Sequence, residues 1–286
     1  MIMTVQDKTD ILRQNTAEID EIQHTANELR YGVLAEAARI AADTDIPPVS
    51  LYTNTVSGDL CTKDFARFCR LYTEHLTSRD KTRLFLPESA KIAEDPEIFT
   101  VAYQKNPYSD RAFSAFAQCR KNIDPQTGTS FQSACEEVYY GRCAACILPI
   151  YSSTDGTLVS FLHMISKYDL KIDMVCDVCV QNEDGILRFA LLRHNLSLPY
   201  AGTVYIQINT VLPDNIQIGA FLSACESTGS TVTDLFTLPL TYTSDFPSYT
   251  IRFRTHASTL SPLLMFLQSV LESYSLEGIF PMIDSN

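Results

Sequence analysis

The sequence predicts a multi-domain protein of mixed α/β and α+β class that begins with a helical segment. The chain of 286 residues is long enough for two or three domains, each with its own core. Apolar residues repeat at helical spacing near the amino terminus, and two different orders of strands and helices follow. We therefore expect three parts, at residues 1–90, 96–197 and 200–286.

The first part is predicted to be helical. An apolar stripe with steps of mainly three, four and seven residues indicates one long amphipathic helix that ends before Pro47. A second helix is expected over Thr62–Thr77, with Thr62 as its amino-terminal cap. The stripe consists of Leu12, Ile19, Ile22, Ala26, Leu29, Val33, Ala37 and Ile40.

The second part alternates strand and helix patterns, which is typical of a sheet with helices packed on it. Ser109 is expected to begin its first helix. The predicted elements are a strand over 99–103, helices over 109–120 and 131–139, a strand over 144–150, a polar turn over 152–156, a helix over 157–166, and strands over 172–180 and 186–192.

The third part has the order βαββαβ, which is the split βαβ pattern of ferredoxin-like domains. This fold supports many functions, so it indicates none by itself. The predicted elements are a strand over 204–212, a helix over 218–227, strands over 230–240 and 249–255, a helix over 261–274 and a strand over 278–283.

Composition and charge exclude several classes of protein. With 45% hydrophobic and 20% charged residues, the chain is typical of soluble globular proteins. The net charge of −12 and the scattered basic residues argue against nucleic acid and membrane surfaces as partners. Met1–Gln14 is polar, and no run of about 18 apolar residues occurs, so we expect a cytoplasmic protein.

The second part resembles the prephenate dehydratases. Ala102-Tyr103-Gln104 and Tyr108-Ser109 resemble the first strand and helix of that family. The run from Leu148 to Thr157 is similar to its Pro-Ile-Glu-Asn-Ser-Thr-Glu-Gly-Ser signature, and Leu187-Arg188-Phe189 stands at the place of its Thr-Arg-Phe. The resemblance implies a periplasmic-binding-protein-like domain that converts prephenate to phenylpyruvate, carbon dioxide and water in L-phenylalanine biosynthesis.

The resemblance also implies which residues form the site. Leu187 occupies the position of the family's catalytic threonine. The implied catalytic residues are Ser153, Thr154 and Arg188, and the implied substrate-binding residues are Tyr108, Ser109, Ser152, Gly156 and Phe189.

Two departures argue against dehydration. The reaction needs an acid that protonates a departing hydroxyl, and the apolar side chain of Leu187 provides none. Only 36 positions separate Ser153 from Phe189, far fewer than in the family, so one lobe of the domain is predicted to be absent. Hydroxyls in a polar turn also serve as local caps, which is the alternative role for Ser152, Ser153 and Thr154.

The third part resembles the ACT domain that follows the dehydratase in this family. Gly219-Ala220-Phe221 matches its Gly-Ala-Leu motif, and Thr237-Leu238-Pro239 matches the end of its Glu-Ser-Arg-Pro motif. The resemblance implies that L-phenylalanine binds as an effector at Gly219, Ala220, Phe221, Thr237 and Pro239. An apolar packing interface is the alternative.

The first helix resembles that of the chorismate mutase domain in bifunctional enzymes, through Leu12-Arg13, Ile19-Asp20 and Arg30. The resemblance implies mutase-like roles for Arg13, Arg30 and Lys81. The two arginines lie 17 residues apart, roughly 25 Å along a helix, so only a second chain brings them to one substrate. Solvated charges on an amphipathic helix are the alternative.

These patterns support three functional hypotheses. The first is a prephenate dehydratase-like protein that binds prephenate or a related small carboxylate. The second is a catalytically inactive regulator or amino-acid-binding pseudoenzyme, and the third is a residual chorismate mutase. In each case we expect a homodimer or larger homo-oligomer.

We expect no cofactor and no metal, because the Cys143/Cys146 and Cys176/Cys179 pairs fall in strands whose alternating faces separate them.

Overall fold

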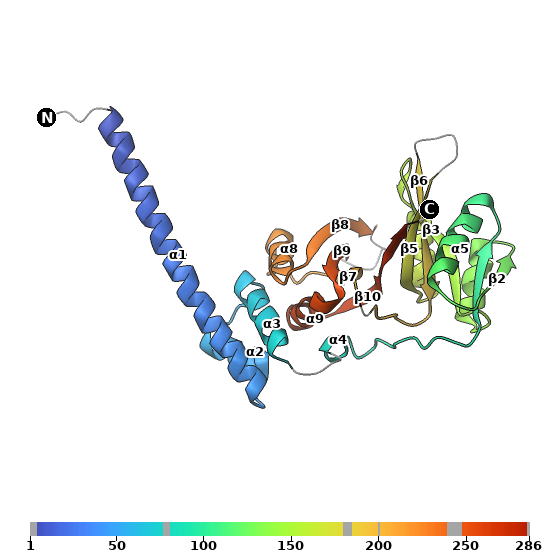
Figure 1. The fold of residues 1–286 in the computed structure, drawn as a ribbon, viewed down its shortest axis with the longest axis horizontal. Helices are drawn as coiled ribbons and strands as arrows, with labels where there is room; N and C mark the ends of the chain where they lie inside the picture. The colour runs from blue at the N-terminus through green and yellow to red at the C-terminus, as the bar shows by residue number, and fades with distance from the viewer. Residues whose placement is uncertain (1–4, 77–80, 180–184, 200, 239–247, 285–286) are drawn as a thin grey trace.

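A computed structural model describes residues 5–76, 81–179, 185–199, 201–238 and 248–284 (Figure 1). Every strand in these ranges belongs to one sheet of 11 strands. The nine strands of its main path have the order β2-β1-β3-β6-β5-β10-β7-β9-β8, while β4 pairs with β3 and β11 pairs with β5. The predicted division into three parts stays a prediction.

The amino-terminal part is helical, as predicted. It consists of α1 (Val5–Asp43), α2 (Pro48–Thr55), α3 (Lys63–His75) and α4 (Lys81–Leu84). The hydroxyl of Thr62 accepts a hydrogen bond from the Phe65 amide at 3.1 Å, which confirms the predicted cap. The short helices α2 and α4 were not predicted, because too few turns are present to show a period.

The middle part has the predicted alternating order. Its elements are β1 (Phe99–Gln104), α5 (Pro107–Cys119), β2 (Ile123–Gly128), α6 (Phe131–Tyr139), β3 (Ala145–Ser152), β4 (Gly156–Thr157), α7 (Val159–Lys167), β5 (Lys171–Cys179) and β6 (Ile186–Arg193). Strand β1 runs parallel to β2 and β3, whereas β6 is antiparallel to β3 and β5. Helix α5 packs on one face of this sheet, and α6 and α7 pack on the other.

Two expectations for this part were wrong. Strand β2 was missed, because it is an exposed edge strand that contains Pro125 and shows no apolar alternation. Helix α5 begins at Pro107 rather than Ser109, because the side chain of Asn106 accepts hydrogen bonds from the Tyr108 and Ser109 amides.

The carboxy-terminal part has the predicted βαββαβ order. Its elements are β7 (Thr203–Val211), α8 (Ile218–Ser227), β8 (Thr231–Leu238), β9 (Ser248–His256), α9 (Leu260–Val270), β10 (Tyr274–Phe280) and β11 (Met282–Asp284). Its four main strands are antiparallel neighbours in the order β10-β7-β9-β8. Helix α9 ends before the predicted limit, and β10 begins at Tyr274.

Helix α3 joins the first part of the chain to the last. Phe65 of α3 and Phe221 of α8 both lie 6.1 Å, between ring centroids, from Phe266 of α9. All three rings are fully buried in one apolar cluster. The helical segment therefore shares a core with the βαββαβ part, while the amino-terminal half of α1 extends away from it (Figure 1).

An ion network holds the segment before β1 against the sheet, with Asp95 exposed and Arg120, Arg193 and Asp173 largely buried. Arg120 donates to Asp173 at 2.7 Å and to Asp95 at 2.8 Å, and Arg193 donates to Asp95 at 2.7 Å. Both guanidinium groups lie over the ring of Phe99. Burial raises the pKa of Asp95, but the hydrogen bonds and charges of the two arginines outweigh it, so the pKa lies below its ordinary value.

The pKa of Asp95 predicts an acid-sensitive contact. A carboxyl group with a lowered folded pKa contributes stability above its unfolded pKa, and that stability is lost as the pH falls through the folded value. We expect the unfolding free energy to drop below about pH 4, and Asp95→Asn to weaken this drop. Urea unfolding at several pH values checks this, with Asp45→Asn, at an aspartate outside the ion network, as the control. An unchanged pH dependence in Asp95→Asn contradicts it.

The contact between β10 and β5 predicts a strict requirement for glycine. A Cβ atom at Gly278 would lie 2.5 Å from the carbonyl oxygen of Ile172, which is backbone that cannot turn aside. We expect Gly278→Ala to lower the unfolding free energy by about 1–3 kcal/mol. Gly58→Ala is the control, because a Cβ there meets nothing within 4 Å. Equal denaturation midpoints for the two variants would contradict the requirement.

Candidate functional site

The residues predicted to form the dehydratase-like site come from the end of β3, the start of β6 and the start of α5. Tyr151 pairs with Arg188, and Ser152 pairs with Leu187. Tyr108 and Leu187 both pack against the apolar cluster beneath α5. The sheet thus gathers these positions near the carboxyl end of β3, the edge at which open α/β sheets bind ligands.

The hydroxyl groups of Ser152 and Ser153 accept hydrogen bonds from backbone amides of the turn after β3 and of β6. Buried Ser152 accepts hydrogen bonds from the Thr154 and Asp155 amides at 3.2 and 3.3 Å. Ser153 accepts one from the Ile186 amide at 2.9 Å. Gly156 has a φ of +74°, which suits glycine in this hairpin. Ser152 thus makes the bonds of a local cap, whereas Ser153 bonds to the start of β6.

Arg188 is held by a partner that the sequence did not indicate. Its Nε donates to Asp177 at 2.7 Å and a terminal nitrogen donates to the other carboxylate oxygen at 2.9 Å. The guanidinium also lies 5.4 Å from the centre of the Tyr151 ring. Chiefly through the hydrogen bond to Asp177, the pKa of Arg188 is raised above its ordinary value. A polar residue within an otherwise apolar strand was the only sequence signal for Asp177.

Three further predicted residues lie in or against the core. Phe189 is buried, and Leu187 packs against the same apolar cluster. Ser109 is fully buried, and its hydroxyl accepts a hydrogen bond from the Asn106 amide nitrogen at 2.8 Å. These side chains support the site rather than line an open surface.

A polar row crosses the face of the βαββαβ sheet that is opposite α8 and α9. Arg252 donates to Asp234 at 3.1 Å and to Gln207 at 2.8 and 3.2 Å. Burial lowers the pKa of Arg252, while the charge of Asp234 opposes that change. Sequence reasoning missed this row, because its members come from three separate strands.

The predicted effector residues are only partly brought together. Gly219 and Ala220 lie exposed in the first turn of α8, and Ala220 lines a cavity of about 660 Å³. Phe221 points into the core instead. Thr237 is exposed on β8, and Pro239 lies outside the described residues.

Two of the mutase-like residues make contacts with α3. Arg30 forms an ion pair with Asp64, and Lys81 donates to the Thr73 carbonyl at 2.6 Å. Arg13 lies on the exposed half of α1. Arg30 and Lys81 thus have partners within the chain, and the mutase-like roles stay a prediction.

Within the described ranges, no group of three or more His, Cys, Asp or Glu side chains is arranged to hold a metal ion. Nor does any helix in the described part of the chain have the length and low polarity that crossing a bilayer requires.

Comparison with known proteins identifies the fold. No protein-family model and no curated protein matches the sequence. The structure is similar to prephenate dehydratase from Streptococcus mutans, with a TM-score of 0.50 and 19% identity over 65% of this chain and 98% of that one. It is also similar to the L-phenylalanine complex of prephenate dehydratase from Arthrobacter aurescens, with a TM-score of 0.51 and 14% identity over 64% and 90% of the two chains. The chain therefore has a prephenate dehydratase-like fold.

Proposed function

We propose that this chain is a non-catalytic, prephenate dehydratase-like protein that responds to an amino acid. The carrying observation is that Arg188 of the predicted site is already paired within the chain. Arg188 is occupied by Asp177 through two hydrogen bonds, and Leu187 offers no hydroxyl beside it. An arginine in this state has fewer donors for a substrate carboxylate.

The shape of the sheet supports the same proposal. Dehydration with loss of carbon dioxide needs an enclosed site that excludes water. Between β3 and β5 the chain forms only β4 and α7, and all described strands lie in one sheet. No second lobe within the described ranges faces the turn at Ser153. Ser153 and Thr154 are exposed in the described structure.

The cavity at the start of α8 suits an amino acid such as L-phenylalanine. Gln217, the cap residue of α8, makes no side-chain hydrogen bond to the first turn, so backbone amides there remain for a carboxylate. Asp59 and Glu272 line the same cavity and suit an ammonium group. Leu60, Ile216 and Val270 provide apolar contacts for a ring. At about 660 Å³ the cavity has the size of common small-molecule sites.

The first test separates the regulator from the enzyme. We expect purified protein to form no phenylpyruvate from prephenate above a protein-free blank, and to bind L-phenylalanine saturably in calorimetry. Ala220→Gln fills space at the cavity wall, so we expect it to weaken binding at least tenfold, or about 1.4 kcal/mol. Ala17→Gln, on exposed helix α1, is the matched control.

Appreciable turnover that Arg188→Ala or Ser153→Ala abolishes would overturn the regulator and establish the dehydratase. Absence of turnover together with absence of L-phenylalanine binding would reject the effector site alone. A chorismate-disappearance assay on the full chain tests the remaining hypothesis, which requires Arg13 and Arg30 from two chains.

We further propose that two chains associate through α1. Leu12, Ile22 and Leu29 are 67%, 68% and 69% exposed, although they belong to the apolar stripe. The packing of α1 within its own chain uses mainly Leu34, Ala38 and Ala41, which lie off the stripe, together with Ala37 near its carboxy-terminal end. A long helix with an uncovered apolar stripe gains little stability from propensity alone, so the stripe requires a partner.

The spacing of the stripe indicates which partner fits. The stripe follows alternating steps of three and four residues. It runs from Leu12 through Asn15, its one polar position, to Ile19, Ile22, Ala26, Leu29 and Val33. An average of 3.5 residues produces a left-handed coiled coil with a helix of the same repeat. The α1 helix of a second copy has that repeat over the same length. The stripe also continues into an apolar groove of about 680 Å³ beside Leu51 of α2.

The second test concerns this assembly. We expect the double variant Ile22→Glu, Leu29→Glu to be monomeric in light scattering, because two charges would enter the apolar seam. Ala17→Glu lies off the seam and should keep the mass of the unmodified protein. Retention of the full oligomer mass by the double variant would reject α1 as the interface.

A further inference from the structure

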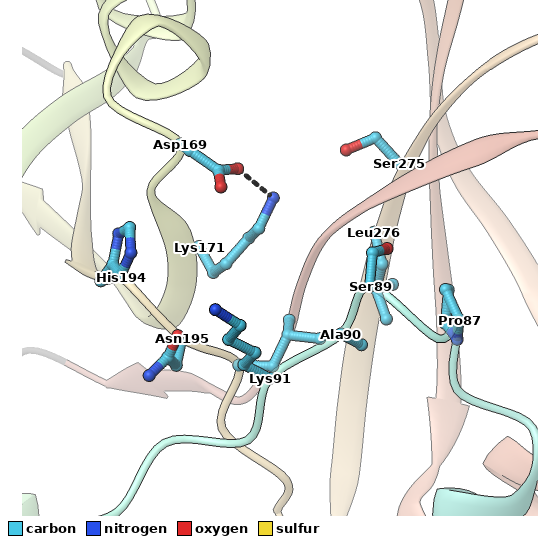
Figure 2. Close-up of a pocket in the computed structure, with 11 residues that line it drawn as sticks. Pro87, Ser89, Ala90, Lys91, Asp169, Lys171, His194, Asn195, Ser275 and Leu276 are labelled. Carbon is cyan, nitrogen blue, oxygen red and sulfur yellow. Dashed lines mark ion pairs between the residues drawn. The ribbon is translucent and has the colours of Figure 1, made fainter.

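A small polar cavity lies where the three predicted parts of the chain meet (Figure 2). It has a volume of about 290 Å³ and is formed by four segments. These are residues 87–91 before β1, residues 169–171 at the start of β5, residues 194–196 after β6, and residues 275–276 of β10. None of these residues belongs to the sites discussed above.

The cavity is basic, although the protein is strongly acidic. Lys91, Lys171 and His194 line it, whereas Asp169 is the one acidic residue among its described lining residues. The whole chain has 34 acidic and 22 basic residues, so a local excess of cations is unusual for it. Such an excess favours an anionic ligand.

Lys171 retains hydrogen-bonding capacity toward the cavity. Its side chain is only 17% exposed, and its ammonium group contacts Asp169 at 2.9 Å (Figure 2). An ammonium group has three donors, and no other acceptor for it occurs among the described residues. The donors that Asp169 does not use are available to a further acceptor in the cavity.

Lys91 adds a second charge that has no partner in the described part of the chain. It is exposed and forms no ion pair there, and its side chain points toward the backbone end of Lys171, whose own ammonium group is directed to Asp169 (Figure 2). Two lysines therefore face the space beside a single carboxylate, which leaves one positive charge unbalanced. A bound ligand with one or two negative charges would balance this positive charge.

Backbone hydrogen bonds fix the main chain of the segments that line the cavity. The Leu196 amide donates to the Lys91 carbonyl at 2.8 Å, and the Ala93 amide donates back to Leu196 at 2.7 Å. Asp169 has a φ of +48° directly after α7, a conformation that aspartate tolerates better than most residues. A fixed arrangement reduces the entropy lost on binding.

Neutral groups complete the lining and limit its size. Ser89, Asn195 and Ser275 contribute polar side chains, and buried Leu196 and Leu276 contribute apolar ones. The volume of about 290 Å³ is at the lower end of the range for small-molecule pockets. The space therefore suits a compact anion.

We propose that this cavity binds a small oxyanion, either phosphate or a short dicarboxylate, between Lys91 and Lys171. The shared chemistry is a compact ligand with two or more anionic oxygens that accept from ammonium donors. Bound there, the ligand contacts the segment before β1, the start of β5 and the start of β10 together. The proposal does not depend on the amino-acid site at α8.

The experiment uses the full chain and calorimetric titration at constant ionic strength. The two arms are inorganic phosphate and succinate, and neutral succinamide is the blank. We expect saturable binding in one or both charged arms with a Kd below about 1 mM. Binding of phosphate alone or of succinate alone supports the proposal and names the ligand class.

Charge-removing variants locate the site. Lys91→Gln and Lys171→Gln should each weaken binding at least tenfold, whereas Lys105→Gln, at an exposed lysine elsewhere, should leave it unchanged. If Lys171→Gln fails to fold, Lys91→Gln still decides, because its side chain is exposed. No saturable binding in either arm, or equal affinity in all three variants, overturns the proposal.

Discussion

The close approach of β10 to β5 is the constraint on which the rest of the structure depends. The backbone of Gly278 lies directly against Ile172, and only a residue without a side chain fits there. This contact joins the sheet of the middle part to the βαββαβ sheet. Once the sheets are continuous, the faces available to helices are fixed. The helices α8 and α9 must then be covered by another element, and α3 covers them with Phe65.

The same junction places polar groups that are distant in sequence next to one another. Lys171 immediately precedes the residue that meets Gly278, and Ser275 lies three positions before Gly278 on β10. The basic cavity is thus a direct result of how the two sheets join. Its two lysines come from segments 80 residues apart, so no local sequence pattern predicts that they line one cavity.

Periodicity predicted those elements whose burial repeats regularly. Helices α6 and α8 have the predicted bounds, because each presents a regular apolar face to the sheet. Strand β2 was not predicted, because an exposed edge strand needs no alternation of apolar residues. The start of α5 depended on which of two polar residues caps it, and the hydrogen bonds of Asn106 decided that locally.

The candidate site was harder to predict than the fold for a related reason. A fold tolerates many apolar exchanges of similar volume, whereas a site depends on a few polar contacts between strands. The sequence located Arg188 on β6, but the register that sets Asp177 opposite it arises only when β5 and β6 pair. Knowing that a residue type is present therefore says little about whether its donors are free.

Helix α3 lies between the proposed amino-acid site and the proposed interface of α1. The loop that lines the cavity at α8 leads directly into α3, and α3 packs against α1 as well as α8 and α9. A ligand in that cavity contacts the loop that positions α3. Thermodynamic linkage then requires that amino-acid binding and assembly strengthen each other to the extent that both favour the same position of α3. A single buried helix is sufficient for such coupling, because its aromatic side chains leave little room for independent movement.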